Sequence, residues 1–245
     1  MPEAETIWII GASDGIGAAL AREWAERGAR LILSARSLNR LEELAACLGT
    51  RHVSLALDVT DRASIDAAAV KIARIGALDR VVNLAALYDP GKVTDVDPAK
   101  AAQIVSANLT GSFHIAQVAP SLLREGGQLA LCGSVAGYIG LPQGQIYSAT
   151  KAGVINLAES LRAELAGRID VRLINPGFVD TRLTQRNDFQ MPAMVTPESA
   201  AHAIIDGLNE KRFEVHFPRR LTLSLKVLRA LPYWAAMPLT RRLAQ

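Results

Sequence analysis

The fold of this chain is decided near its start, by Ile7-Trp8-Ile9-Ile10-Gly11-Ala12-Ser13-Asp14-Gly15-Ile16-Gly17. The run of apolar residues predicts a buried strand, and the three glycines lead directly into a helical pattern. Glycines allow a tight turn, let backbone approach a pyrophosphate and let helix and strand pack closely, while the helix N-terminus favours an anion. The stretch therefore predicts a phosphate-binding turn, and a purely structural turn is the alternative.

Short apolar runs alternate with longer helical patterns along the rest of the chain. Parallel strands joined by helices are covered on both faces, because such crossovers are right-handed. We therefore predict an α/β fold with one doubly wound, Rossmann-like parallel sheet of seven strands. The expected strands cover 6–10, 30–35, 52–57, 79–83, 128–132, 170–174 and 213–217, and the expected helices cover 16–27, 38–48, 61–75, 98–124, 147–166 and 197–210.

Composition places the chain among ordinary globular proteins. It has 245 residues, of which 50% are hydrophobic and 21% charged, enough to bury roughly three quarters of its extended surface in one domain without disulfides. Cys47 and Cys132 are expected to be free thiols, and no metal-ligand cluster accompanies them. Residues 1–6 lack the basic start and long apolar core of a secretory signal, so we expect a cytoplasmic protein.

The net charge of +3 hides an uneven distribution. Residues 211–245 carry eight Lys and Arg against one acid, a net +7, which leaves about −4 for residues 1–210. The basic character belongs to the C-terminal tail, so the sequence does not favour nucleic-acid binding.

The sharpest chemical pattern is Gly133-Ser134, followed by Tyr147-Ser148-Ala149-Thr150-Lys151. Residues four apart share one face of a helix, so Tyr147 and Lys151 are expected to be neighbours. A tyrosine can give a proton to a developing alkoxide, and a nearby ammonium stabilises the phenolate and so lowers the pKa of the phenol. A surface pair is the alternative, but the serine after a strand and the upstream nucleotide turn favour a reactive site.

Together these motifs resemble the short-chain dehydrogenase/reductase family over residues 5–217. The resemblance implies hydride transfer between a nicotinamide dinucleotide and a small carbonyl or alcohol. It assigns acid–base transfer to Tyr147, a ribose contact to Lys151 and polarisation of the carbonyl to Ser134. It also implies that Asn108 holds a water in the proton relay behind the lysine.

The same resemblance implies a set of cofactor-binding residues. Ile10, Leu84 and Ala86 depart from the family's usual Thr, Asn and Gly at their positions, and Ile10 is expected to remove one hydrogen bond between the turn and the fourth strand. For Asp58 a plain helix cap is the competing interpretation. Besides Tyr147 and Lys151, the implied residues are Gly11, Ser13, Asp14, Gly15, Ile16 and Gly17 at the phosphates, Asp58 and Val59 at the adenine, Asn83 and Ala85 after the fourth strand, and Pro176, Gly177, Val179 and Thr181 at the nicotinamide.

Two residues at the end of the second strand indicate which dinucleotide is bound. Ala35 stands where NAD-dependent relatives carry the acid that binds the ribose hydroxyls, and Arg36 follows it. A guanidinium suits a 2′-phosphate, so NADP(H) is favoured over NAD(H). The alternatives are that Arg36 is a solvated charge and that Asp14 repels the phosphate.

The loop at 178–196 has no clear periodicity and is expected to be a lid or binding loop, with a surface excursion as the alternative. Together with Leu141, Pro142 and Phe178, its residues 183–196 are expected to shape an apolar substrate pocket. We divide the chain into a dinucleotide-binding and catalytic domain at 1–218 and a basic amphipathic extension at 219–245.

Leucines at helical spacing predict a helical extension interrupted at Pro232. It would cover the substrate cleft or a neighbouring subunit, contact an anionic membrane surface peripherally, or bind a partner as a peptide. We predict an NADP(H)-dependent carbonyl/alcohol oxidoreductase, a homodimer or homotetramer through 98–124 and 147–166. The alternatives are a non-catalytic NADP(H)-binding regulatory protein and a membrane-surface lipid ketoreductase.

Overall fold

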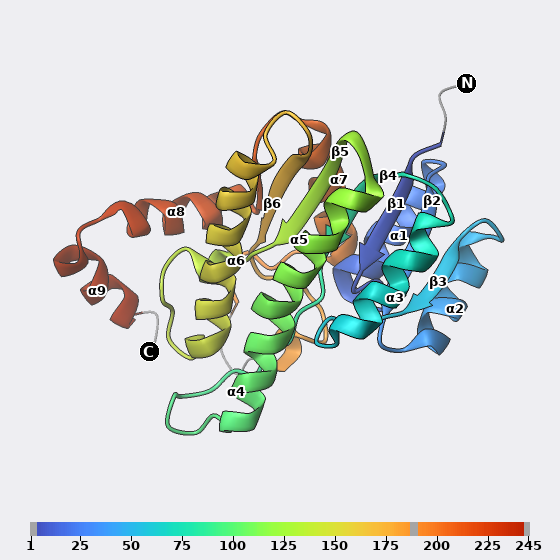
Figure 1. Cartoon of the computed structure of the whole chain (residues 1–245). Coiled ribbons are helices and arrows are strands. Elements are labelled where there is room, and N and C mark those ends of the chain that lie inside the picture. Colours follow the sequence, from blue (N-terminus) through green and yellow to red (C-terminus); the bar gives the residue numbers. More distant parts are fainter. Residues whose placement is uncertain (1–3, 187–190, 243–245) are drawn as a thin grey trace.

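Seven parallel strands form one sheet in the computed structural model, which describes residues 4–186 and 191–242 (Figure 1). The strand order is β3-β2-β1-β4-β5-β6-β7, so the direction of winding reverses between β1 and β4. This confirms the predicted doubly wound sheet. The strands are β1 (Thr6–Ile10), β2 (Arg30–Ala35), β3 (Val53–Ala56), β4 (Leu78–Asn83), β5 (Leu123–Cys132), β6 (Asp170–Pro176) and β7 (Glu214–Phe217).

Helices cover both faces of the sheet. One apolar cluster joins the sheet to α1, α2 and α7, and the other joins it to α3, α5 and α6. The apolar residues of each helix therefore pack on the face of the sheet that the helix covers. The helices of these layers are α1 (Gly15–Glu26), α2 (Leu38–Leu48), α3 (Arg62–Ala73), α4 (Pro98–Val105), α5 (Gly111–Leu122), α6 (Gln145–Glu164) and α7 (Pro197–Asn209).

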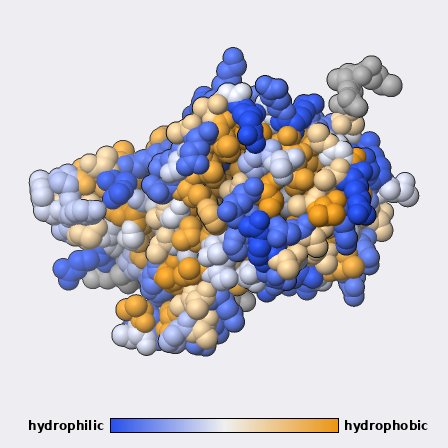
Figure 2. All heavy atoms as spheres, viewed as in Figure 1, coloured by the Kyte–Doolittle hydropathy of each residue, from blue (hydrophilic) through white to orange (hydrophobic). Residues whose placement is uncertain are grey.

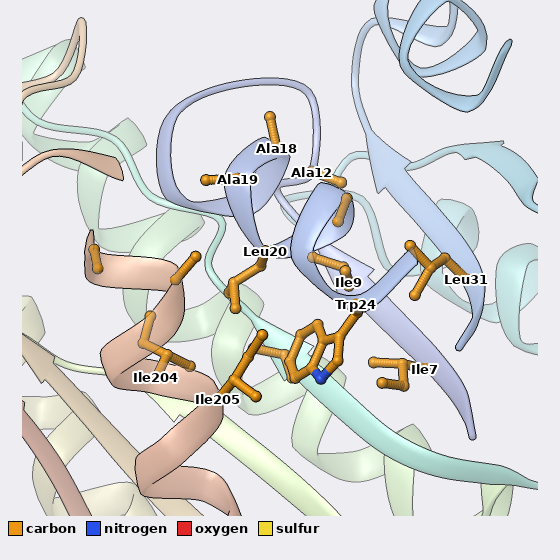
Figure 3. Packing of buried hydrophobic residues seen from close by; sticks show 14 of the residues in the cluster. Ile7, Ile9, Ala12, Ala18, Ala19, Leu20, Trp24, Leu31, Ile204 and Ile205 are labelled. Carbon is orange, nitrogen blue, oxygen red and sulfur yellow. The ribbon is translucent and has the colours of Figure 1, made fainter. Parts of the chain in front are cut away.

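The central strand β1 shows why the apolar run at the start of the chain forms a buried strand. Ile7 and Ile9 pack with α1 and α7, whereas Trp8 and Ile10 pack on the opposite face, since successive side chains of a strand alternate. Trp24 of α1 extends between Ile7 and Ile205 of α7 (Figure 3). A strand that is buried on both faces needs the continuous apolar run seen in the sequence.

The expected continuous helix over 98–124 is wrong at two places. A π-helical turn at Ser106–Thr110 separates α4 from α5, and β5 begins at Leu123, earlier than the predicted 128. Leu123 pairs with Leu78 of β4, after which the register shifts. The positive φ of Gly126 accommodates this irregular start, which apolar periodicity does not reveal.

The C-terminal extension consists of two helices, α8 (Arg219–Ala230) and α9 (Tyr233–Arg242), with Pro232 between them. It projects from the β7 side of the molecule (Figure 1). Thr222 and Leu225 of α8 are buried, and Thr222 Oγ1 lies 2.7 Å from His216 Nδ1 of β7. Within the described ranges, no helix has both the length and the apolar character to cross a bilayer.

Asp170, at the start of β6, is expected to make folding sensitive to acid. Burial by itself would raise the pKa of this carboxyl, but hydrogen bonds from Arg172, Gln128 and Arg162 outweigh burial and hold the pKa at about 2. Because the pKa is depressed in the folded state, this stabilisation is present above the unfolded pKa near 4 and is lost as the pH falls towards 2. Unfolding free energies of wild type and Asp170→Asn should therefore converge in that window, whereas Asp66→Asn, on the exposed face of α3, should leave the pH profile unchanged.

Candidate active site

A cleft of about 860 Å³ follows the carboxyl ends of the strands on both sides of the point where the winding reverses. Ligands of open α/β sheets bind at such a position. One end of the cleft lies at Arg36 after β2, and the other lies at Ser134 and Tyr147, after β5 and on α6. The cleft therefore joins the predicted nucleotide residues to the predicted reactive ones.

The turn between β1 and α1 is shaped for close approach of a ligand. Gly11 has a φ of +86°, and a Cβ added there would lie 2.9 Å from the backbone nitrogen of Ala85. A Cβ at Gly17 would lie 2.2 Å from the carbonyl oxygen of Gly11. Only glycine fits at either position, and the N-terminus of α1 points its free N–H groups at the cleft. This cradle suits a pyrophosphate.

A different contact replaces the one expected to be lost at Ile10. The carbonyl of Ser34 in β2 accepts hydrogen bonds from the N–H groups of Gly11 (2.7 Å) and Ala12 (3.1 Å). The Ser34 hydroxyl in turn accepts a bond from the indole of Trp8 at 2.9 Å. The turn is thus tied to β2 through backbone, while Ile10 contributes to the core.

Arg36 and Asp58, after β2 and β3, both line the cleft. Burial alone would raise the pKa of Asp58, but hydrogen bonds from Thr60 and the charge of Arg36 hold it below its ordinary value. Asp58 accepts from Thr60 N–H at 2.9 Å and from Thr60 Oγ1 at 2.7 Å. Within residues 4–186 and 191–242, no carboxylate lies within ion-pair distance of Arg36, and Asp58 interacts with its charge only at longer range.

Asp14, which the sequence placed close enough to repel a phosphate, pairs with a cation. Its carboxylate forms an ion pair with Arg182 and accepts the Gly15 N–H at 2.7 Å. A Cβ at Gly15 would lie 2.9 Å from Thr181 Cγ2. The segment after β6 therefore closes over the phosphate turn, and it brings Pro176, Gly177, Val179 and Thr181 to the cleft.

Asn83 lies beneath the cleft and does not line it. It is almost fully buried, accepts the Ala85 N–H at 3.2 Å and donates to Ser112 Oγ at 3.2 Å. It thereby shapes the turn that carries Ala85, which does line the cleft. Apart from Asn83 and Asn108, the predicted residues line the cleft, namely Gly11, Ser13, Asp14, Gly15, Ile16, Gly17, Arg36, Asp58, Val59, Ala85, Ser134, Tyr147, Lys151, Pro176, Gly177, Val179 and Thr181.

Tyr147 and Lys151 lie one turn apart on α6, and both face the cleft. Lys151 Nζ donates to the Cys132 carbonyl at 2.7 Å and lies 5.7 Å from the centre of the Tyr147 ring. Contrary to the prediction that Lys151 lowers it, the pKa of Tyr147 is raised, because burial outweighs a hydrogen bond to Ser134. Burial also lowers the pKa of Lys151. The phenol is therefore protonated at neutral pH, ready to donate.

Asn108 lies one layer behind these groups, in the π-helical turn. Its side chain accepts from Leu87 N–H at 2.7 Å and donates to the Leu87 carbonyl at 2.9 Å. It also donates to Thr150 Oγ1 at 3.1 Å. The Asn108 amide therefore links the loop after β4 to Thr150 of α6, which lies between Tyr147 and Lys151 in the sequence. Its place in a π-helical turn agrees with this role, because such turns occur often at functional sites.

Several lining residues were not predicted. The ring of Tyr88 lies edge-on to the ring of Tyr147, with centroids 4.7 Å apart. Arg40, on the first turn of α2, faces the same end of the cleft as Arg36. The sequence could have indicated Arg40, because it lies four residues after Arg36, whereas nothing in the sequence relates Tyr88 to Tyr147.

The predicted substrate pocket is only partly confirmed. Leu141, Pro142 and Phe178 lie outside the lining of this cleft, contrary to prediction, while Leu183 and Thr184 of the expected loop lie within it.

The expected loop 178–196 has some structure of its own. Val179 pairs with Val195 as an isolated bridge, which brings the two ends of the loop together, and a short 3₁₀ turn covers Thr184–Arg186. Residues 187–190 lie outside the described part.

One carboxylate connects the site to the extension. Glu214 of β7 accepts hydrogen bonds from Tyr138, in the segment after Ser134, from Asn175 Nδ2 at 2.7 Å, and from Lys226 of α8. Burial alone would raise the pKa of Glu214, but these bonds hold it below its ordinary value. The carboxylate is therefore charged at neutral pH.

A phosphate cradle at the reversal of the sheet, with a serine, a tyrosine and a lysine at the far end of the same cleft, defines a nicotinamide-dependent oxidoreductase. A family model described as short chain dehydrogenase matches residues 5–191. The chain belongs to the short-chain dehydrogenase/reductase family and is an enzyme of the kind that acts on CH–OH groups.

Curated relatives agree with this assignment. An uncharacterized oxidoreductase of Myxococcus xanthus is 32% identical over 234 residues, which cover 93% of this chain and 92% of the relative. Another, of Staphylococcus epidermidis, is 32% identical over 206 residues, covering 82% and 90% of the two chains.

Solved structures agree as well. A short-chain dehydrogenase of Sphingobium yanoikuyae in complex with NADPH has a TM-score of 0.80 and 25% identity, covering 97% of this chain and 94% of the other. An alcohol dehydrogenase of Thermococcus sibiricus complexed with 5-hydroxy-NADP has a TM-score of 0.80 and 27% identity, with 88% and 96% covered.

Proposed function

We propose that this protein is an NADP(H)-dependent oxidoreductase that interconverts a carbonyl and a secondary alcohol. The observation that carries the proposal is the pair Tyr147 and Lys151 on one face of α6, in one cleft with Ser134 and the phosphate cradle. NADPH supplies the hydride when it is bound. Arg36 would hold its 2′-phosphate, and Gly11 and Gly17 leave room for its pyrophosphate.

In the reductive direction, the Ser134 hydroxyl donates a hydrogen bond to the carbonyl oxygen and so favours negative charge on it. As hydride reaches the carbon, the Tyr147 hydroxyl gives its proton to the same oxygen and becomes a phenolate. The Lys151 ammonium, with Nζ 5.7 Å from the centre of that ring, stabilises the phenolate by its charge. Asn108 would hold a water of the proton relay behind Lys151, and its amide also binds Leu87 and Thr150.

We also propose the functional division of the chain and its assembly. Residues 1–218 form the dinucleotide-binding and catalytic domain, and 219–245 extend it. The protein works in the cytoplasm as a homodimer or homotetramer through α4–α5 and α6. Exposed Phe113 on α5 supports this surface, and light scattering tests it.

Replacing Arg36 by Ala should weaken NADPH binding by about 10–100-fold and leave NADH binding nearly unchanged, because charge-assisted hydrogen bonds to a phosphate contribute about 1.5–3 kcal/mol. Fluorescence titration with each nucleotide measures this. Arg168→Ala, at an exposed arginine away from the cleft, is the control. Equal weakening for NADPH and NADH would contradict a role at the 2′-phosphate.

A carbonyl panel then tests the reaction. Turnover of any member by wild type supports the proposal. NADPH binding without turnover of any compound would instead favour a regulatory protein that senses the nucleotide.

A further inference from the structure

The extension has an unusually apolar exposed surface. Trp234 is 81% exposed, Tyr233 68% and Val227 65%. Exposed apolar patches of this kind mark interaction sites. The large hydrophobic side chains exposed within α8 and α9 are Leu223, Val227, Tyr233, Trp234, Met237 and Leu239.

The same surface is basic throughout. Glu214 is the last acidic residue of the chain, and six arginines and lysines follow it. Arg220, Arg229 and Arg241 are exposed, and none of them forms an ion pair with a described carboxylate. Figure 2 shows hydrophilic and hydrophobic surface side by side on the lobe that projects at the left.

The first helix of the extension, α8, is held against the body by specific contacts. Lys226 binds Glu214 of β7, and Leu221 packs so closely on Gly177 that a Cβ there would lie 2.9 Å from Leu221 Cδ2. Ala236 and Thr240 of α9 are also buried. The contacts of Lys226 and Leu221 therefore fix α8 on the body, next to the end of β6.

The positive charge of the extension indicates which kind of partner it binds. A second copy seated on this face would bring like charges together, which opposes self-association. An anionic bilayer offers the opposite charge for the arginines and an apolar layer below it for the aromatic rings. Helices with an apolar side and a basic side lie in that interface without crossing it.

We propose that α8 and α9 bind the surface of a membrane that contains anionic phospholipids. Tyr233 and Trp234 enter the boundary between headgroups and acyl chains, and Arg220, Arg229 and Arg241 bind headgroup phosphates. The inference does not depend on the proposed reaction, because the face lies outside the cleft.

Sedimentation with lipid vesicles tests this inference on the full chain. Wild type should bind vesicles of phosphatidylglycerol mixed with phosphatidylcholine, should not bind phosphatidylcholine alone, and should be released by salt. Removing the three arginines together, as Arg220→Gln, Arg229→Gln and Arg241→Gln, should lower the partition coefficient about a hundredfold, since each basic residue contributes about fivefold. The control replaces Lys71, Arg74 and Arg168 by Gln, which lowers the net charge from +3 to the same value of zero.

The apolar contribution is tested separately. Trp234→Ser should weaken binding about tenfold and should remove a blue shift of tryptophan fluorescence on vesicles, whereas Val93→Ser, at a site 77% exposed elsewhere, should do neither. Absence of binding to the vesicles that contain phosphatidylglycerol, equally strong binding to phosphatidylcholine alone, or equal loss in the two triple variants would overturn the inference. A change of mass in light scattering on Trp234→Ser would show instead that a second copy covers the face.

Discussion

Replacing Tyr147 by Phe is expected to lower turnover of carbonyl substrates by about a thousandfold. General acid catalysis contributes about 10²–10⁴-fold, and the variant removes the only hydroxyl on this ring while the ring still packs on Tyr88. NADPH affinity should change little, because the phosphate cradle and Arg36 lie at the other end of the cleft. Initial rates and a nucleotide titration on the same protein measure the two effects.

The matched control is Tyr233→Phe, which removes a phenol hydroxyl from an exposed side chain of α9. It should keep the wild-type rate in solution. If Tyr147→Phe retains more than about a tenth of the wild-type rate, an acid other than Tyr147 supplies the proton.

The rates of carbonyl reduction and alcohol oxidation should depend on pH in opposite ways, because both use Tyr147. Burial raises the pKa of Tyr147, so the protonated form needed for reduction persists through neutral pH and is lost only as the pH rises through that pKa. Alcohol oxidation needs the phenolate and should therefore rise with pH. Parallel pH profiles for the two directions would contradict this assignment.

Replacing Gly17 by Ala is the second change expected to have a large effect. The added Cβ would lie 2.2 Å from the Gly11 carbonyl oxygen and 2.9 Å from its carbon, so α1 and the turn must move apart. Overpacking of this kind costs about 1–3 kcal/mol of stability, and the movement opens the cradle for the pyrophosphate. We expect NADPH binding to weaken more than about tenfold and the melting temperature to fall by a few degrees.

Gly140→Ala is the control for this change, because no atom lies within 4 Å of a Cβ added there and its φ is not positive. It should bind NADPH and unfold as wild type does. If Gly17→Ala binds NADPH as tightly as Gly140→Ala, the turn does not carry the pyrophosphate.

The features that could be predicted from sequence depend on local spacing. Ile7, Trp8, Ile9 and Ile10 are all buried, on alternate faces of the sheet, which requires a continuous apolar strand. A spacing of four places Tyr147 and Lys151 together on any helix. The family's motifs then relate residues that lie far apart in the sequence to one binding site. Nearly all of the predicted nucleotide residues therefore reach one cleft.

The features that could not be predicted depend on contacts between distant segments. The start of β5 at Leu123 is set by pairing with Leu78, and Tyr88 meets Tyr147 only because two separate loops converge. The backbone bonds from the Ser34 carbonyl to the phosphate turn involve no side chain that a sequence motif could record. Likewise, Leu141 and Pro142 follow Ser134 closely, but the chain turns away from the cleft before it reaches them.

The side chain of Glu214 holds three separate segments of the chain together. Tyr138, Asn175 and Lys226 are far apart in sequence, and all three bind its carboxylate. A random substitution at this position would release the segment after Ser134, the strand end before Gly177 and the extension at the same time. The activity is therefore expected to be sensitive to substitution of a residue that does not line the cleft, and an inactive variant there would mimic the loss of a reactive group.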